Sequence, residues 1–172
     1  MRRLIPALAV AAIALPALAG PASVTVPILG PQGQAMGSAT LTEGPRGVLV
    51  RVEAKGLTPG WHGLHFHEKA DCSSADFKSA GGHMHDAMPV AHGLLNPAAN
   101  ETGDLPNLFA GADGVANAEV FSTLVSLGAE GRGRLLDADG SALVIHASPD
   151  DHLTQPIGGA GARVACAVIK AP

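Results

Sequence analysis

The chain has 172 residues, a length typical of one domain, and its formal net charge at pH 7 is −4. Its 11 lysines and arginines are scattered rather than clustered, which argues against a nucleic-acid partner. Aromatic residues make up only 3%, whereas 22 glycines and 13 prolines predict many turns between short elements.

The first 19 residues have the pattern of a secretory signal peptide. A pair of arginines near the start is followed by an apolar run from Leu4 to Leu18 and then by small residues. The run is short and interrupted by prolines, so it does not predict a membrane span. We expect cleavage near Ala19 and a periplasmic domain formed by residues 20–172, with no membrane association after cleavage. The general secretory and twin-arginine routes both stay open.

Short apolar runs separated by turn residues predict an all-β domain. Turn signals such as Gly30-Pro31-Gln32-Gly33 and Asp113-Gly114 bound these runs, and no long stretch has a helical period. This spacing is typical of an antiparallel sandwich or barrel. The eight predicted strands are residues 23–28, 35–42, 47–54, 60–67, 108–110, 115–122, 141–146 and 163–169.

The fourth predicted strand carries the sequence WHGLHFH. Because successive side chains of a strand point to opposite faces, His65 and His67 share one face, while Leu64 and Phe66 share the other. One face can pack in the core while the other presents two imidazoles, which is the start of a copper or zinc site. His62 has the opposite parity and is not expected to bind the same metal. Surface histidines are the alternative, but five more histidines follow this strand.

Two long stretches, residues 68–106 and 147–162, lack the strand pattern and are rich in glycine and polar residues. Loops of this length in a compact domain are usually functional or disordered. Metal binding or a disulfide would order them. Cys72 lies in the first stretch and Cys166 near the C-terminus. In an exported protein this pair predicts one disulfide, and two free buried thiols are the alternative.

Four motifs occur along the chain: HGLHFH, then AGGH, GDLPN and GARVAC. Together they resemble the copper–zinc superoxide dismutases, in the bacterial periplasmic form, over residues 23–169. The resemblance implies an eight-stranded Greek-key β-barrel, an immunoglobulin-like sandwich, with two long functional loops. It also implies an enzyme that disproportionates superoxide to oxygen and hydrogen peroxide at a redox-cycling copper, with zinc as a second cofactor.

The resemblance assigns the metal ligands residue by residue. The residues that match copper ligands are His65, His67, His83 and His146. His83 would also bridge to zinc and act in catalysis as a proton carrier. His92 and Asp104 match further zinc ligands.

Other positions match residues that support the metals. Asp150 matches the carboxylate that links a copper-ligand histidine to a zinc-ligand histidine, and Arg163 matches the catalytic arginine that orients the anion. Cys72 and Cys166 match the family's disulfide, and His62 matches a buried histidine that bonds the backbone. A surface strand position for Arg163, and a simple turn at Asp150, are the alternatives.

The sequence departs from the family pattern at the zinc site. Glu101 stands where the family has a third zinc histidine, and the segment between His83 and His92 is one residue longer and contains His85. Two interpretations stay open. Glu101 is a zinc ligand, or it is a solvated loop residue and the zinc site is weak or empty. His85 and His152 are candidates to replace the missing histidine, and the alternative for each is an ordinary surface histidine.

A rival function is that of a non-enzymatic periplasmic protein that binds or buffers copper. A third is a structural barrel with a degenerate site. The arginine at position 163 favours the enzyme, because a storage protein does not need a group that orients an anion. The superoxide anion is the expected partner, and the sequence leaves a homodimer open.

Overall fold

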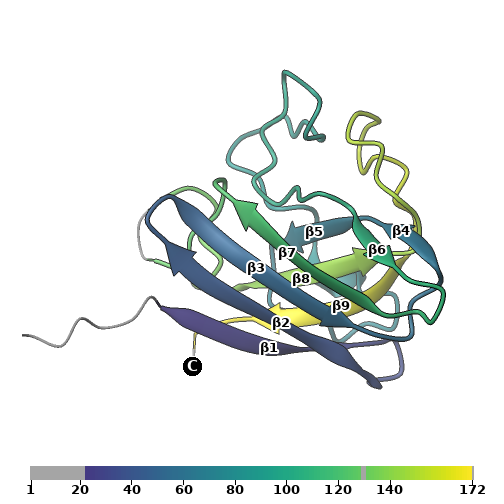
Figure 1. Cartoon of the computed structure of the whole chain (residues 1–172). Helices are drawn as coiled ribbons and strands as arrows, with labels where there is room; N and C mark the ends of the chain where they lie inside the picture. Colours follow the sequence, from purple (N-terminus) through teal and green to yellow (C-terminus); the bar gives the residue numbers. More distant parts are fainter. Residues whose placement is uncertain (1–21, 129–130, 172) are drawn as a thin grey trace, which may run out of the picture.

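The computed structural model describes residues 22–128 and 131–171, so the predicted signal peptide lies outside the described residues. Figure 1 shows an almost entirely β molecule with two long loops that rise from the same end. The strands are β1 (Ser23–Leu29), β2 (Ala35–Gly44), β3 (Gly47–Ala54), β4 (Gly60–His62), β5 (Leu64–His67), β6 (Leu108–Ala110), β7 (Ala116–Ser122), β8 (Ser141–His146) and β9 (Arg163–Ile169). A short 3-10 turn, η1 (Lys78–Ala80), lies in the first loop. Among the described residues, no helix has the length and apolar character needed to cross a membrane.

The strands form an antiparallel barrel. Seven of them are hydrogen-bonded in the order β5-β8-β9-β1-β2-β3-β7, and β4 pairs separately with β6. Strand β4 continues directly into β5, and β6 lies beside β7, so these two contacts close the ring. The neighbours β3–β7 and β9–β1 are far apart in sequence, as Greek-key crossovers require. The predicted fold is confirmed.

The fourth predicted strand is interrupted at Gly63, which separates β4 from β5. The Gly63 N–H donates to the Ser148 carbonyl (2.8 Å), and the Gly63 carbonyl accepts from the His146 N–H (2.9 Å). The break lets β4 pair with β6 while β5 pairs with β8. Counting β4 and β5 as one interrupted strand gives the eight strands predicted from the sequence.

Burial along the strands explains where the loops lie. In β3, exposed Leu49, Arg51 and Glu53 alternate with buried residues that face the barrel core. Strands β5 and β8 are instead buried on both faces. The inner face of β8 packs in the barrel, and its outer face lies under the first loop. This outer face of β5 and β8 is the floor of the candidate site.

Candidate metal centre

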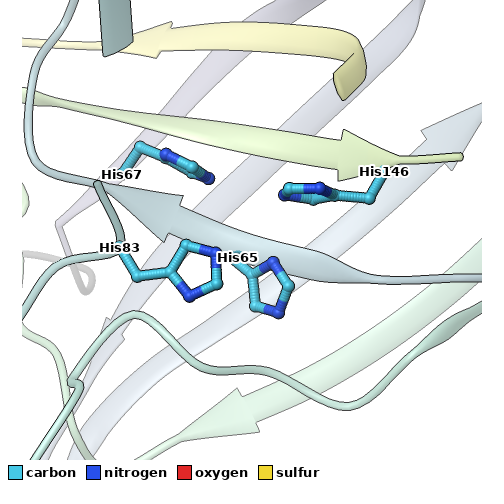
Figure 2. Close-up of side chains that lie close together, drawn as sticks. All are labelled: His65, His67, His83 and His146. Atoms are coloured by element: carbon cyan, nitrogen blue, oxygen red, sulfur yellow. The ribbon is translucent and has the colours of Figure 1, made fainter. Parts of the chain in front are cut away.

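Four histidines from three parts of the chain meet on this outer face. His65 and His67 come from β5, His146 ends β8, and His83 comes from the first loop. One ring nitrogen of each lies within 4.8 Å of those of the others, and all four residues are buried. Figure 2 shows the four rings gathered beside β5 and the end of β8. The predicted parity of His65 and His67 is confirmed.

The backbone of the first loop is paired with β5, and this pairing brings His83 to the site. The Phe66 N–H donates to the Gly103 carbonyl (2.8 Å), and the Phe66 carbonyl accepts from the Met84 N–H (2.9 Å). A Cβ on Gly103 would lie 2.2 Å from the Phe66 carbonyl oxygen, so only glycine permits this approach. The pairing sets His83 opposite His67, in an isolated bridge.

For three of these four histidines, a hydrogen bond to one ring nitrogen fixes which nitrogen faces the centre of the group. Nδ1 of His67 donates to the Gly81 carbonyl (3.0 Å), and Nδ1 of His146 donates to the Gly161 carbonyl (3.2 Å). Nε2 of His65 donates to Oδ2 of Asp150 (2.8 Å). The opposite nitrogen of each ring is therefore the one that carries the free lone pair.

Those opposite nitrogens are the observation that fits a copper ion. Each is buried and has no hydrogen-bond partner among the described residues; the atoms are His65 Nδ1, His67 Nε2, His83 Nε2 and His146 Nε2. Burial lowers the pKa of His67 to about 2 and that of His146 to about 3, and it also lowers the pKa of His65. Converging ring nitrogens without a partner, three of them on rings that these lowered pKa values keep neutral, are a donor set that suits copper.

A second group lies on the other side of His83 and contains the unexpected Glu101. Oε2 of Glu101 is 2.9 Å from His83 Nδ1 and 2.7 Å from His92 Nδ1. Oδ1 of Asp104 is 3.4 Å and 3.1 Å from the same two nitrogens. All four residues are buried. The interpretation of Glu101 as a solvated loop residue is therefore wrong, because its carboxylate is enclosed with both histidines.

The carboxylates of this group hold protons on its histidines. Although burial lowers the pKa of His92, hydrogen bonds to Asp104, Asp150 and Glu101 raise it to about 11. The pKa of His83 is also raised, because its bonds to Asp104 and Glu101 outweigh burial. The Asp104 pKa is lowered, since the bonds to both histidines outweigh the cost of burial. A divalent cation binding at this point would replace these protons.

Asp150 connects the two groups. Its Oδ2 accepts from His65 Nε2 (2.8 Å), and its Oδ1 accepts from His92 Nε2 (3.1 Å). The pKa of Asp150 is lowered, because these hydrogen bonds outweigh burial. A Cβ on Gly158, whose φ is 59°, would lie 1.6 Å from Oδ1. The second loop therefore encloses the carboxylate at a position where only glycine fits.

Arg163 begins β9 beside the four histidines, and two carbonyls hold its guanidinium. Nη1 donates to the Phe77 carbonyl and Nη2 to the Gly81 carbonyl, both at 2.7 Å. The side chain lines a pocket of about 450 Å³ together with His146 and Lys78. Burial lowers the arginine pKa, yet arginine stays charged in proteins. The pocket therefore offers an anion a fixed cation next to a copper-type histidine.

A disulfide holds the first loop on the barrel. Cys72 is bonded to Cys166 of β9, at a Cα–Cα distance of 5.9 Å and a sequence separation of 94. The predicted pairing is confirmed, and the alternative of two free thiols is wrong. Closing a loop of this length stabilises a fold by roughly 4–5 kcal/mol on chain-entropy grounds.

The remaining histidines lie outside both groups. The ring nitrogens of His62 bond the carbonyls of His146 (2.6 Å) and Thr58 (2.8 Å), so the predicted backbone role is confirmed. Nδ1 of His85 bonds the His83 carbonyl (3.0 Å). His152 lies against Asp150, with 3.4 Å between Nδ1 and Oδ2. Neither His85 nor His152 joins a group of described residues that could hold a metal ion.

The carbonyls of Phe77, Gly81 and Gly161 are the site components that the sequence did not reveal. They orient Arg163 and two histidines through backbone atoms. Every residue has such a carbonyl, so no residue pattern could have identified these three.

Comparison with known proteins gives one answer. Residues 35–169 match the family described as copper/zinc superoxide dismutase (SODC). A copper–zinc superoxide dismutase of Caulobacter vibrioides is 64% identical over 149 residues, which cover 86% of each chain. One from Aquifex aeolicus is 39% identical over 83% of this chain and 84% of its own.

Solved structures agree with this match. A double mutant of a superoxide-dismutase-like protein from Bacillus subtilis superposes with a TM-score of 0.81 and is 38% identical, over 86% of this chain and 97% of that one. The Cu/Zn superoxide dismutase from Brucella abortus gives a TM-score of 0.69 at 34% identity, over 86% of this chain and 99% of its own. The chain belongs to the copper/zinc superoxide dismutase family.

Proposed function

We propose that this protein disproportionates superoxide, so that two superoxide anions and two protons yield oxygen and hydrogen peroxide. Copper would be held by His65, His67, His83 and His146, and it would supply one-electron exchange between its two oxidation states. Membership of the family and the names of the relatives support this activity. The converging free nitrogens of the four histidines are the single observation that carries the proposal.

Arg163 binds and orients the anion. Two carbonyls hold its guanidinium at 2.7 Å, so the side chain is already in place before superoxide binds. The planar guanidinium offers directed donors that lysine lacks. The guanidinium lines the same pocket as His146, so an anion bound there would lie beside the histidine group.

His83 is placed to carry a proton. Its Nε2 faces the other three histidines that would hold copper, and its Nδ1 faces Glu101 and Asp104. A ring that lies between both groups can hold a proton on Nε2 and give it to the reduced dioxygen species. This transfer supplies one of the two protons that hydrogen peroxide requires.

Zinc would be held by His83, His92, Glu101 and Asp104, with Glu101 in the place of the family's third histidine. The role of zinc would be structural, because it has no redox chemistry. Burial of Glu101 and its contacts of 2.9 and 2.7 Å with the two histidine nitrogens support its assignment as a ligand. Two carboxylates make this donor set harder than the usual one.

Residues 1–19 are proposed to be removed during export, which yields a periplasmic protein with an oxidised Cys72–Cys166 pair. The disulfide supports an oxidising compartment. N-terminal sequencing of the exported protein tests the cleavage near Ala19. A mature protein that still carried Arg2 and Arg3 would contradict it.

The function is tested by measuring copper and zinc per chain in the mature protein together with its rate of superoxide disproportionation. We expect one copper per chain and a rate that disappears in His65→Ala. The rival, a protein that only buffers copper, predicts bound copper without turnover. Full copper loading with no rate above that of the His65→Ala control would favour the rival.

A further inference from the structure

Phe77 has a backbone conformation that is unusual for a large side chain. Its φ is 55° and its ψ is 17°, in the left-handed region. Among the described residues only His152 shares a positive φ without being glycine. For a bulky residue this conformation is a genuine outlier. Such a conformation persists where the surroundings fix it, and it is concentrated at functional sites.

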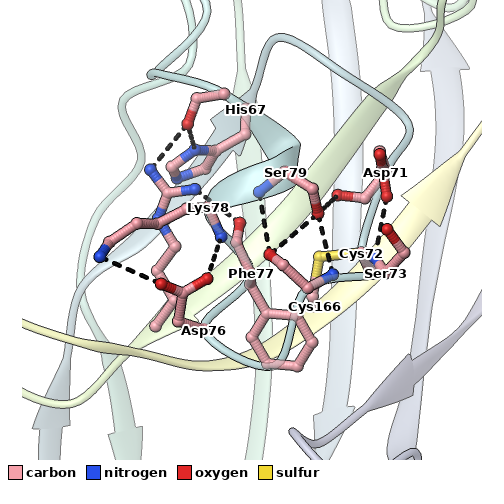
Figure 3. Close-up of a disulfide and its surroundings, with 12 residues drawn as sticks. His67, Asp71, Cys72, Ser73, Asp76, Phe77, Lys78, Ser79 and Cys166 are labelled. Carbon is pink, nitrogen blue, oxygen red and sulfur yellow. Dashed lines mark hydrogen bonds and ion pairs between the residues drawn. A yellow bond between two sulfur atoms is a disulfide. The ribbon is translucent and has the colours of Figure 1, made fainter.

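The side chain of Phe77 supplies that fixation. Its ring is only 2% exposed and belongs to a small apolar cluster separate from the barrel core. Figure 3 shows the ring beside the disulfide, on the outer wall of the barrel. The other buried or half-buried members of this cluster are Ala80, Ala142, Val144, Cys166 and Cys72. The ring therefore holds the loop backbone against β8 and β9 at a point five residues beyond Cys72.

The carbonyl of the same residue faces Arg163. It accepts from Nη1 at 2.7 Å and from the Ala80 N–H at 3.2 Å. The second nitrogen, Nη2, is held by the Gly81 carbonyl, which also accepts from His67 Nδ1. One half of the guanidinium is thus set by a carbonyl that a metal-ligand histidine shares. The other half is set by Phe77.

We propose that Phe77 is a positioning residue for Arg163. Its buried ring keeps the loop in the left-handed conformation, and that conformation directs the carbonyl at the guanidinium. This inference rests on the proposed function, in which Arg163 binds the anion. The disulfide cannot replace the ring, because Cys72 is separated from Phe77 by four residues whose dihedral angles it does not set.

Two substitutions of Phe77 should weaken the positioning of Arg163 to different degrees, and a third substitution, at Val144, serves as the control. Phe77→Gly leaves the left-handed conformation accessible but removes the ring that selects it. Phe77→Leu keeps a smaller apolar group in the cluster. Val144→Ala opens the same cluster from β8 without changing the loop backbone. All three variants keep both cysteines and all the histidines of the two metal groups.

Two measurements report on Arg163 without superoxide turnover. The first is the affinity of azide for the copper-loaded mature protein, followed by visible absorption. The second is the ¹⁵N spectrum of the Arg163 side chain in the metal-free mature protein, where a held guanidinium gives separate Nη signals. We expect Phe77→Gly to weaken azide binding by about 3- to 10-fold, the size of one typical hydrogen bond, and to average the Nη signals. Phe77→Leu should lie between Phe77→Gly and the wild type.

Val144→Ala should lower the melting temperature while azide affinity and the Nη signals stay as in the wild type. Wild-type azide affinity and separate Nη signals in Phe77→Gly would overturn the proposal, whatever happens to its melting temperature. If Phe77→Gly does not fold, the same wild-type result in Phe77→Leu overturns it. A failure of the proposed function would instead appear as azide binding and held Nη signals without superoxide turnover.

Discussion

Replacing Asp150 tests whether one carboxylate supports both metal groups. Its two oxygens accept from His65 Nε2 (2.8 Å) and His92 Nε2 (3.1 Å), and its side chain is fully buried. Asp150→Ala removes both acceptors, so each ring loses the bond that fixes its tautomer. Outer partners of metal-binding histidines are worth about 10- to 100-fold in metal affinity, or about 1.4–2.7 kcal/mol. We expect a loss of that size for copper and for zinc.

Asp150→Asn should affect the binding of the two metals differently. The N–H of His152 donates to Oδ1 at 2.6 Å, on the same oxygen that accepts from His92. The amide oxygen of asparagine should therefore take the Oδ1 position, and its NH₂ group should face the N–H of His65. Two donors then face each other on the copper side, while the zinc side keeps its acceptor. We expect copper affinity to fall in Asp150→Asn and zinc affinity to stay close to that of the wild type.

The assay is competition with a chelator for each metal separately, run on wild type, both variants and Asp151→Asn. Asp151 is the matched control, because it is exposed and its side chain accepts hydrogen bonds from Leu153 and Thr154 of its own loop. Wild-type retention of both metals by Asp150→Ala would refute the reasoning. Loss of zinc rather than copper in Asp150→Asn would show that the amide adopts the opposite orientation.

Four further substitutions test single residues. Arg163→Ile should lower the rate of superoxide disproportionation by at least about tenfold with copper content unchanged, since it removes a donor to the anion rather than a ligand; an unchanged rate would exclude the arginine from the mechanism. His62→Ala should keep copper but lower the free energy of unfolding by about 1–3 kcal/mol in chemical denaturation, because two backbone carbonyls lose their partner. His65→Ala should lose copper, and the reverse outcome for these two variants would contradict the strand parity. Glu101→His should retain zinc longer against a chelator at one pH, because zinc favours imidazole over a second carboxylate; equal or shorter retention would show that the carboxylate is at least as good a ligand.

Local patterns in the sequence determined the strands and the first pair of candidate ligands. Alternation along a strand placed His65 and His67 on one face and excluded His62, because the side-chain period of a strand is two. The chain has only two cysteines, so each had only the other as a possible partner, and the pair predicted the disulfide that the structure contains. The order of motifs identified the family and, through it, the barrel.

Only the tertiary structure decided that Glu101 is buried and which nitrogen each histidine ring turns toward the site. Glu101 meets His83 and His92 because the first loop folds back along β5, and no local rule specifies that closure. The break at Gly63 likewise depends on contacts with a residue 85 positions away, in the second loop. The carbonyls that direct Arg163 and the histidines belong to the backbone, which is the same at every residue, so only their positions in space distinguish them.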